Sequence, residues 1–187
     1  MERYIYLVFT DTGTYFTRLI KFFTKRPYNH ASLSMDADLY HVYSFGRKNI
    51  RNPFEGGFVR EEMGNEFFHS ARATIYRCSV TEEQYQKTRQ LITRFDEQRD
   101  QYKYNLLGLF AIALKKQWSR KNAFCCSQFV AFVLEEAGII RFEKSISLVT
   151  PQDLSELTSM DAVFEGELAD YLNRETIMYV GNKLSAI

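Results

Sequence analysis

The sequence predicts an α+β fold in which an antiparallel sheet packs against helices. A nearly continuous run of β-forming residues, Tyr4–Phe9, is typical of a buried strand. Two further strand patterns, Tyr28–Met35 and Leu39–Phe45, are separated only by the turn Asp36–Asp38. Such a short connection requires antiparallel pairing. Later in the chain, apolar residues recur at helical spacing in several segments, so helices should cover the sheet.

The other elements of the first half follow from local patterns. Apolar residues at helical spacing predict a helix over residues 15–24, and Pro27 should end it. Residues 46–63 contain Pro53 and three glycines and predict a long irregular segment. Loops of this length are often binding loops or lids, although a solvated surface excursion is equally consistent with the pattern. Ala73–Val80 predicts a strand in which Cys78 belongs to the core.

The second half predicts four helices and one or two final strands. Thr81–Gln84 forms a capping box that opens a helix ending by Arg99. Asn105–Lys116 predicts a more apolar helix, whose apolar run is too short to span a bilayer. A third helix begins near Cys126 and ends at Gly138, and a short fourth begins at Pro151 after a capping threonine. Residues 162–165 and 176–180 predict the final strands.

Composition limits the classes of protein to which the chain can belong. A length of 187 residues predicts one domain over 1–187. The formal net charge of +1, with acids and bases interspersed, argues against a nucleic-acid partner. Three cysteines without CxxC pairs, and no clustered histidines, predict neither a disulfide framework nor a metal site, and no cofactor is expected. Without a signal-peptide pattern or a transmembrane segment, we expect a cytoplasmic protein with reduced thiols.

The helix that begins at Cys126 carries the most informative pattern. One apolar stripe runs along it through Phe129 and Val133, and this places Cys126 in the first turn. Backbone N–H groups are unpaired there and the helix dipole favours negative charge. A thiol in this position can lose its proton well below its usual pKa of about 8.5. The residue therefore has two interpretations, a cysteine nucleophile or an inert buried cysteine.

A cysteine nucleophile needs a base, and the chain holds three histidines. His69 lies in a poorly patterned stretch and has no evident role. His30 begins a predicted strand and shares one strand face with Ser32 and Ser34. His41 lies in the strand expected to pair with it. Taken alone, each of these two histidines is more typical of a structural role than of a catalytic one.

Two short segments together resemble a known family. Asn-His-Ala-Ser-Leu-Ser at residues 29–34 and Phe-Cys-Cys-Ser-Gln-Phe-Val at residues 124–130 resemble the two signatures of the NlpC-type, papain-like cysteine hydrolases. Here the histidine precedes the cysteine, which is the order of the circularly permuted branch. That branch includes the YiiX-like bacterial proteins and the lecithin retinol acyltransferase group. The resemblance covers roughly residues 3–157 and implies a papain-like α+β fold with the histidine strand before the cysteine helix.

The resemblance also implies roles for particular residues. Cys126, rather than Cys125, would be the nucleophile and His30 its base. A third, polar residue would orient the histidine, and His41 is the first choice. Ser44, on the other strand face, and Tyr43, which shares a face with His41, are the alternatives. The residues expected around the substrate and the oxyanion are Tyr28, Asn29, Ser127 and Gln128.

The implied function is that of a cysteine hydrolase or acyl transferase working through an acyl-enzyme. An amide, an ester or a thioester would be attacked by the same thiolate, and a peptide, a lipid or a small molecule could carry it. One alternative is a non-catalytic module that binds a lipid or peptide in its cleft. Another is a redox sensor at Cys125 and Cys126, which is disfavoured because a disulfide between adjacent cysteines is strained.

Overall fold

The computed structural model describes residues 2–11, 29–49, 52–65, 68, 70–105 and 121–174. These residues form an α+β fold in which one antiparallel sheet packs against helices, as the sequence predicts. The sheet has six strands in the order β4-β3-β2-β1-β5-β8, and every neighbouring pair is antiparallel. The strands are β1 (Arg3–Asp11), β2 (His30–Ser34), β3 (Val42–Asn49), β4 (Asn52–Glu61), β5 (Arg72–Val80) and β8 (Asp161–Glu167).

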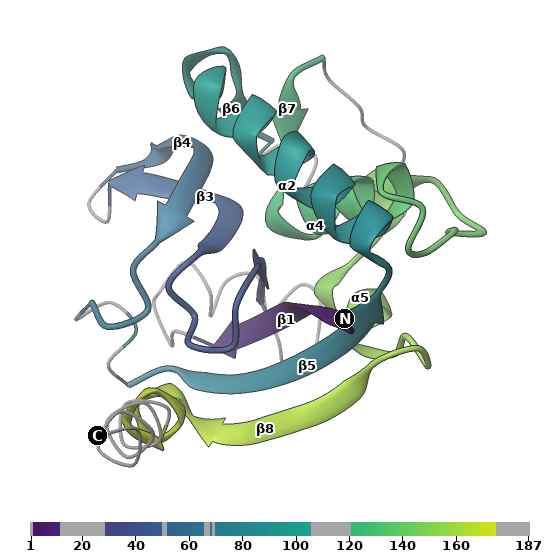
Figure 1. The fold of residues 1–187 in the computed structure, drawn as a ribbon. Helices are drawn as coiled ribbons and strands as arrows, with labels where there is room; N and C mark the ends of the chain where they lie inside the picture. The colour runs from purple at the N-terminus through teal and green to yellow at the C-terminus, as the bar shows by residue number, and fades with distance from the viewer. Residues whose placement is uncertain are drawn as a thin grey trace, which may run out of the picture.

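Helices lie on the concave side of this sheet. Figure 1 shows α2 (Glu82–Glu97) and α4 (Cys126–Glu136) between the β3–β4 hairpin and the β1–β5–β8 part of the sheet. The smaller elements are α5 (Pro151–Ser155), the 3-10 turns η2 (Arg99–Gln101) and η3 (Ile146–Leu148), and a parallel pair, β6 (Lys103–Tyr104) with β7 (Ala123–Phe124). Residues 168–174 are also helical.

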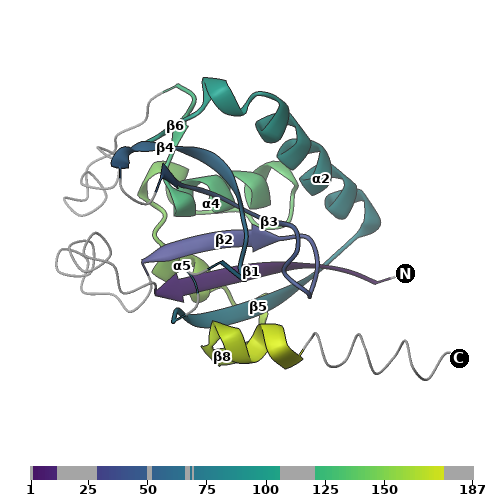
Figure 2. The same ribbon diagram turned by 90° about the vertical axis from the view of Figure 1, so that its left-hand side faces the viewer.

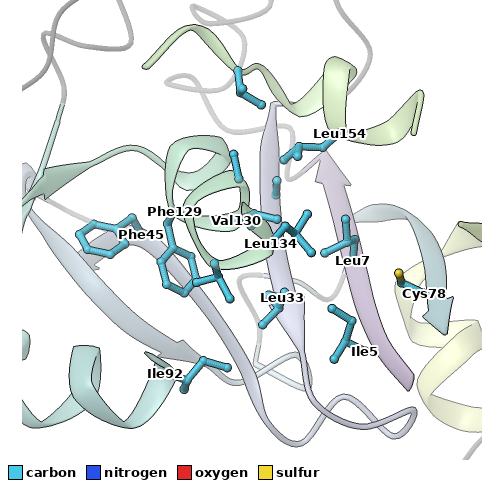
Figure 3. Packing of buried hydrophobic residues seen from close by; sticks show 14 of the residues in the cluster. Ile5, Leu7, Leu33, Phe45, Cys78, Ile92, Phe129, Val130, Leu134 and Leu154 are labelled. Atoms are coloured by element: carbon cyan, nitrogen blue, oxygen red, sulfur yellow. The ribbon is translucent and has the colours of Figure 1, made fainter. Parts of the chain in front are cut away.

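The main core lies between the sheet and α4. In Figure 3, Val130 and Leu134 of α4 point toward Leu7 of β1 and Leu33 of β2. All four side chains are fully buried. Phe129 of α4 packs on Phe45 of β3, with ring centroids 5.4 Å apart. The helix is therefore held against both halves of the sheet, and its first turn is fixed with it.

A second core covers the opposite face of the sheet. Val8 of β1 and Ile75 of β5 are fully buried there beside Leu168 from the C-terminal helical turn. The sheet is thus covered on both sides, and polar groups on its second face are also shielded from water.

The helix and strand predictions within the described ranges are largely confirmed. β1, β2 and β5 occupy the predicted positions, and α2 opens with the predicted capping box at Thr81. α4 and α5 begin where predicted, and Gly138 follows α4 with φ of +70°. Cys78 is buried in the core, and residues 162–165 lie within β8. The predicted helix over 15–24 and the strand over 176–180 lie outside the described residues, as does the predicted helix over 105–116 except for Asn105.

The prediction of an irregular segment over 46–63 is wrong. β3 continues to Asn49, and β4 runs antiparallel beside it as far as Glu61. Gly56 and Gly57 do not interrupt β4. They allow residues 102–104 to pack closely against it. A Cβ on Gly57 would lie 2.7 Å from the carbonyl oxygen of Tyr102, and one on Gly56 would lie 2.6 Å from the Tyr104 Cβ.

The third strand begins at Val42, later than expected, because residues 36–41 form the turn. Within the described ranges, none of the helices combines the length and the apolar character needed to cross a membrane.

Candidate active site

The first turn of α4 is fixed by its own side chains. Gln128 Oε1 accepts a hydrogen bond from the Cys125 backbone N–H at 3.0 Å, and Gln128 Nε2 donates to the Ser147 carbonyl at 3.0 Å. Ser127 Oγ donates to the Val149 carbonyl at 2.6 Å. Ser127 and Gln128, expected near the substrate, are themselves buried. Their side chains hold the helix start against residues 147–149, and the position of Cys126 is thereby fixed.

Cys126 reaches the sheet where β2 and β3 separate. Among the described residues these strands pair only at Leu33↔Tyr43 and Ser34↔Val42, near one end of β2. Toward the other end, β3 continues with β4 instead, and α4 contacts both β2 and β3. Figure 2 shows β1 and β2 side by side below α4, while β3 and β4 arch away from them. This separation leaves the Ala31 N–H free to donate to Cys126.

The Cys126 thiol is surrounded by donors. Burial alone raises the pKa of the thiol, because a thiolate loses hydration. A hydrogen bond from His30, the positive charge of that ring and the N–H groups of Ala31 and Ser127 all act in the opposite direction. These interactions outweigh burial, and the pKa of Cys126 is lowered. The site therefore stabilises the thiolate, as expected for a helix N-terminus beside an imidazolium.

The imidazole ring of His30 is held from its other side by Glu61. His30 Nε2 lies 2.6 Å from Glu61 Oε1, and the Glu61 side chain is only 8 % exposed. Because Nε2 is engaged in this way, Nδ1 is the ring nitrogen left for Cys126. Burial lowers the pKa of His30, but the Glu61 carboxylate and Cys126 favour the charged ring more strongly. The pKa of His30 is therefore raised well above its usual value.

The Glu61 carboxylate accepts three hydrogen bonds. Besides His30, it accepts from Ser44 Oγ at 2.8 Å and from Ser32 Oγ, whose contact is shorter still. Burial raises the pKa of Glu61, but the charge of His30 and these three donors outweigh it. The pKa of Glu61 is consequently lowered, so the carboxylate remains ionised. The cluster thus runs as one chain of contacts from Glu61 through His30 to Cys126.

The expectation that His41 contacts His30 is wrong. His41 is exposed on the turn before β3, and its Nδ1 bonds Asp36 Oδ2 at 2.7 Å. Tyr43 lies on the side of the sheet that faces the helices, where its ring stacks on Phe58. Ser44 does belong to the cluster, but it bonds Glu61 rather than the histidine. The residue that hydrogen-bonds the His30 ring in place of His41 is Glu61.

Sequence reasoning missed Glu61 because it lies in the segment read as irregular. The signal was nevertheless present in the spacing. Once 52–61 is recognised as a strand paired with β3, Val59 lies opposite Ser44 and Glu61 opposite Val42. Directly opposed residues share a face, so Glu61 falls on the same face as Ser44 and Ser32.

The other predicted residues differ in their environments. Asn29 is buried, and its Nδ2 donates to Asp11 Oδ1 at 2.8 Å. Tyr28 and His69 lie outside the described residues. Cys125 is also a free, buried thiol, but burial and the neighbouring Cys126 raise its pKa to about 12. In the described part of the chain, no group of three or more potential metal-ligating side chains gathers.

Comparison with known proteins leaves the site to be interpreted from its own geometry. The sequence matches no family model, no curated protein and no solved structure.

Proposed function

We propose that the protein is a cysteine hydrolase with a papain-like fold of permuted order, in which Cys126 is the nucleophile and His30 its base. One observation carries the proposal. The pKa of a buried cysteine in the first turn of a helix is lowered by a histidine, and the ring of that histidine is held by a buried, ionised carboxylate. Nucleophile, base and orienting group in contact are the arrangement used for acyl transfer.

The chemistry begins from a thiolate–imidazolium pair. The Cys126 thiolate attacks the carbonyl carbon of an acyl substrate, and the carbonyl π electrons move to oxygen. The Cys126 backbone N–H, at the first position of α4, is placed to donate to that oxyanion. When the tetrahedral intermediate collapses, the bond to the leaving group breaks and His30 supplies the leaving group with a proton.

Hydrolysis of the acyl-enzyme completes the cycle. Neutral His30 removes a proton from water, and the hydroxide oxygen attacks the thioester carbonyl. The carbon–sulfur bond then breaks, which releases the carboxylic acid and restores the thiolate beside the imidazolium. Throughout, the charge of Glu61 stabilises the protonated ring, and its position fixes the ring orientation.

Trapping the acyl-enzyme tests this proposal. The wild type is incubated briefly with an activated ester, p-nitrophenyl hexanoate, and the intact mass and peptide map are recorded. We expect one hexanoyl group on Cys126, none in Cys126→Ala, and undiminished labelling in Cys125→Ala. A hexanoyl adduct that persists in folded Cys126→Ala, or that maps to another residue in the wild type, contradicts the assignment.

A further inference from the structure

Beside the histidine lies a buried amide whose oxygen has no hydrogen-bond donor in the described part of the chain. Asn29 immediately precedes His30 and is only 4 % exposed. Its Nδ2 donates to Asp11 Oδ1. An ionised carboxylate can only accept hydrogen bonds, so the nitrogen must be the amide atom that faces Asp11. The orientation of the amide is thereby fixed, and its oxygen, Oδ1, has no hydrogen-bond partner among the described residues.

The strand order indicates the direction of this oxygen. Asp11 ends β1, which lies on one side of β2, while β3 lies on the other. Because the amide nitrogen is directed at Asp11, the oxygen of the planar amide group is turned away from it. The separation between β2 and β3 lies on the side of β2 away from β1. There the N–H of Ala31, two residues beyond Asn29, donates to Cys126.

A buried acceptor without a donor is destabilising, and a substrate that supplies the donor removes that penalty. The three acyl substrates open to a cysteine nucleophile differ in this respect. In a secondary amide the leaving-group nitrogen carries a hydrogen, whereas the leaving-group oxygen of an ester and the sulfur of a thioester carry none. We propose that Asn29 Oδ1 accepts the N–H of a scissile amide, so the substrates are amides or peptides. This inference rests on the proposed function.

The contact also suits the departure of the amine. The leaving nitrogen must receive a proton on its lone pair from His30 as the carbon–nitrogen bond breaks. A hydrogen bond from its existing N–H to Asn29, the neighbour of that histidine, restricts rotation of the nitrogen during this transfer. Sites built to bind a substrate N–H discriminate strongly against analogues that lack it.

The test compares an anilide and an ester with the same acyl group. We would measure kcat/KM for hexanoyl p-nitroanilide and for p-nitrophenyl hexanoate in the wild type and in Asn29→Ala. We expect the anilide rate to fall about tenfold or more while the ester rate changes little. Asn29→Leu, which retains more of the side-chain volume, should show the same selective loss.

Thr10→Val is the matched control. Thr10 lies directly opposite His30 in the β1–β2 pairing and is fully buried, and its hydroxyl oxygen also lacks a partner within the described ranges. Its replacement removes a buried polar group beside the histidine but leaves the amide in place. We expect the ratio of anilide to ester rates to remain that of the wild type in this variant.

The possible outcomes separate the two proposals. Equal losses on both substrates in the Asn29 variants, or no loss, overturn the amide inference. The amide inference is also overturned if the ester acylates Cys126 of the wild type but the anilide does not. In each of these cases the cysteine hydrolase remains. If neither substrate acylates Cys126 in the wild type, both proposals fall.

Discussion

At the residue scale, the pKa values of two adjacent cysteines are shifted in opposite directions. Cys125 and Cys126 are both buried, and burial raises the pKa of each. Only Cys126 also receives the hydrogen bond and positive charge of His30, and its pKa ends below the usual value. Placement at the helix start is shared by both residues, so the partner rather than the helix decides which thiol is reactive.

Alkylation should distinguish these thiols. With iodoacetamide near pH 6, we expect rapid labelling at Cys126 and none at Cys125 or Cys78, whose pKa values are raised. In His30→Ala, labelling of Cys126 should slow and require a higher pH, because the positive charge is gone. Peptide mapping across a pH series measures this. An ordinary thiol profile at Cys126, unchanged in His30→Ala, would contradict the ion pair.

Replacing Glu61 should reveal the source of the charge on His30. Glu61→Gln preserves the shape of the carboxylate but removes its charge, so the pKa of His30 should fall. We expect kcat/KM on the ester to drop roughly tenfold or more, since each pKa unit is about 1.4 kcal/mol. The alkaline limb of the pH–rate profile should move to lower pH.

His41→Ala is the control for that experiment, because the exposed His41 bonds Asp36 instead. Wild-type rates in Glu61→Gln, together with a loss in His41→Ala, would restore His41 as the orienting residue.

At the scale of elements, the position of Cys126 depends on how α4 is anchored. Ser127 Oγ donates to the buried Val149, so Ser127→Ala leaves that carbonyl without its donor. We expect the free energy of unfolding to fall by about 1–3 kcal/mol. Ser155→Ala is a suitable comparison, because its hydroxyl donates to Gln152 within the short helix α5. Urea titration of both variants should give the larger loss for Ser127→Ala; equal losses would mean that the anchor is unimportant.

The sequence predicts some of these elements and not others. α2 and α4 were predictable because their caps and apolar stripes are local patterns. The β3–β4 hairpin was not, because Gly56 and Gly57 look like strand breakers until the Tyr104 side chain and the Tyr102 carbonyl are placed against them. Cys126 and His30 carry motifs of their own. Glu61 has none, and its role follows only from the pairing of β4 with β3.

At the scale of the whole molecule, the buried charges make stability depend on pH. The pKa of Glu61 is lowered from 4.5, so its contribution is present above that pH and is lost as the pH falls through the lowered value. The pKa of His30 is raised from 6.5. Its contribution is present below pH 6.5 and is lost as the pH rises through the raised value.

The difference in unfolding free energy between the wild type and Glu61→Gln should therefore be greatest between these limits. We expect it to shrink in acid below pH 4.5, and again on the alkaline side as His30 loses its proton. Urea unfolding over a pH series measures the difference. A gap that is constant with pH would mean that folding does not lower the pKa of Glu61.

His30, Glu61 and Cys126 lie far apart along the chain, on β2, β4 and α4. Synthesis proceeds from the N-terminus, so the histidine and the glutamate leave the ribosome well before the cysteine does. Until β2 and the start of α4 meet, Cys126 is an ordinary thiol and is protonated at neutral pH. In a growing chain, and in any misfolded copy, Cys126 therefore lacks the increased acidity that it has in the folded protein. The reactive sulfur appears only as the last consequence of correct folding.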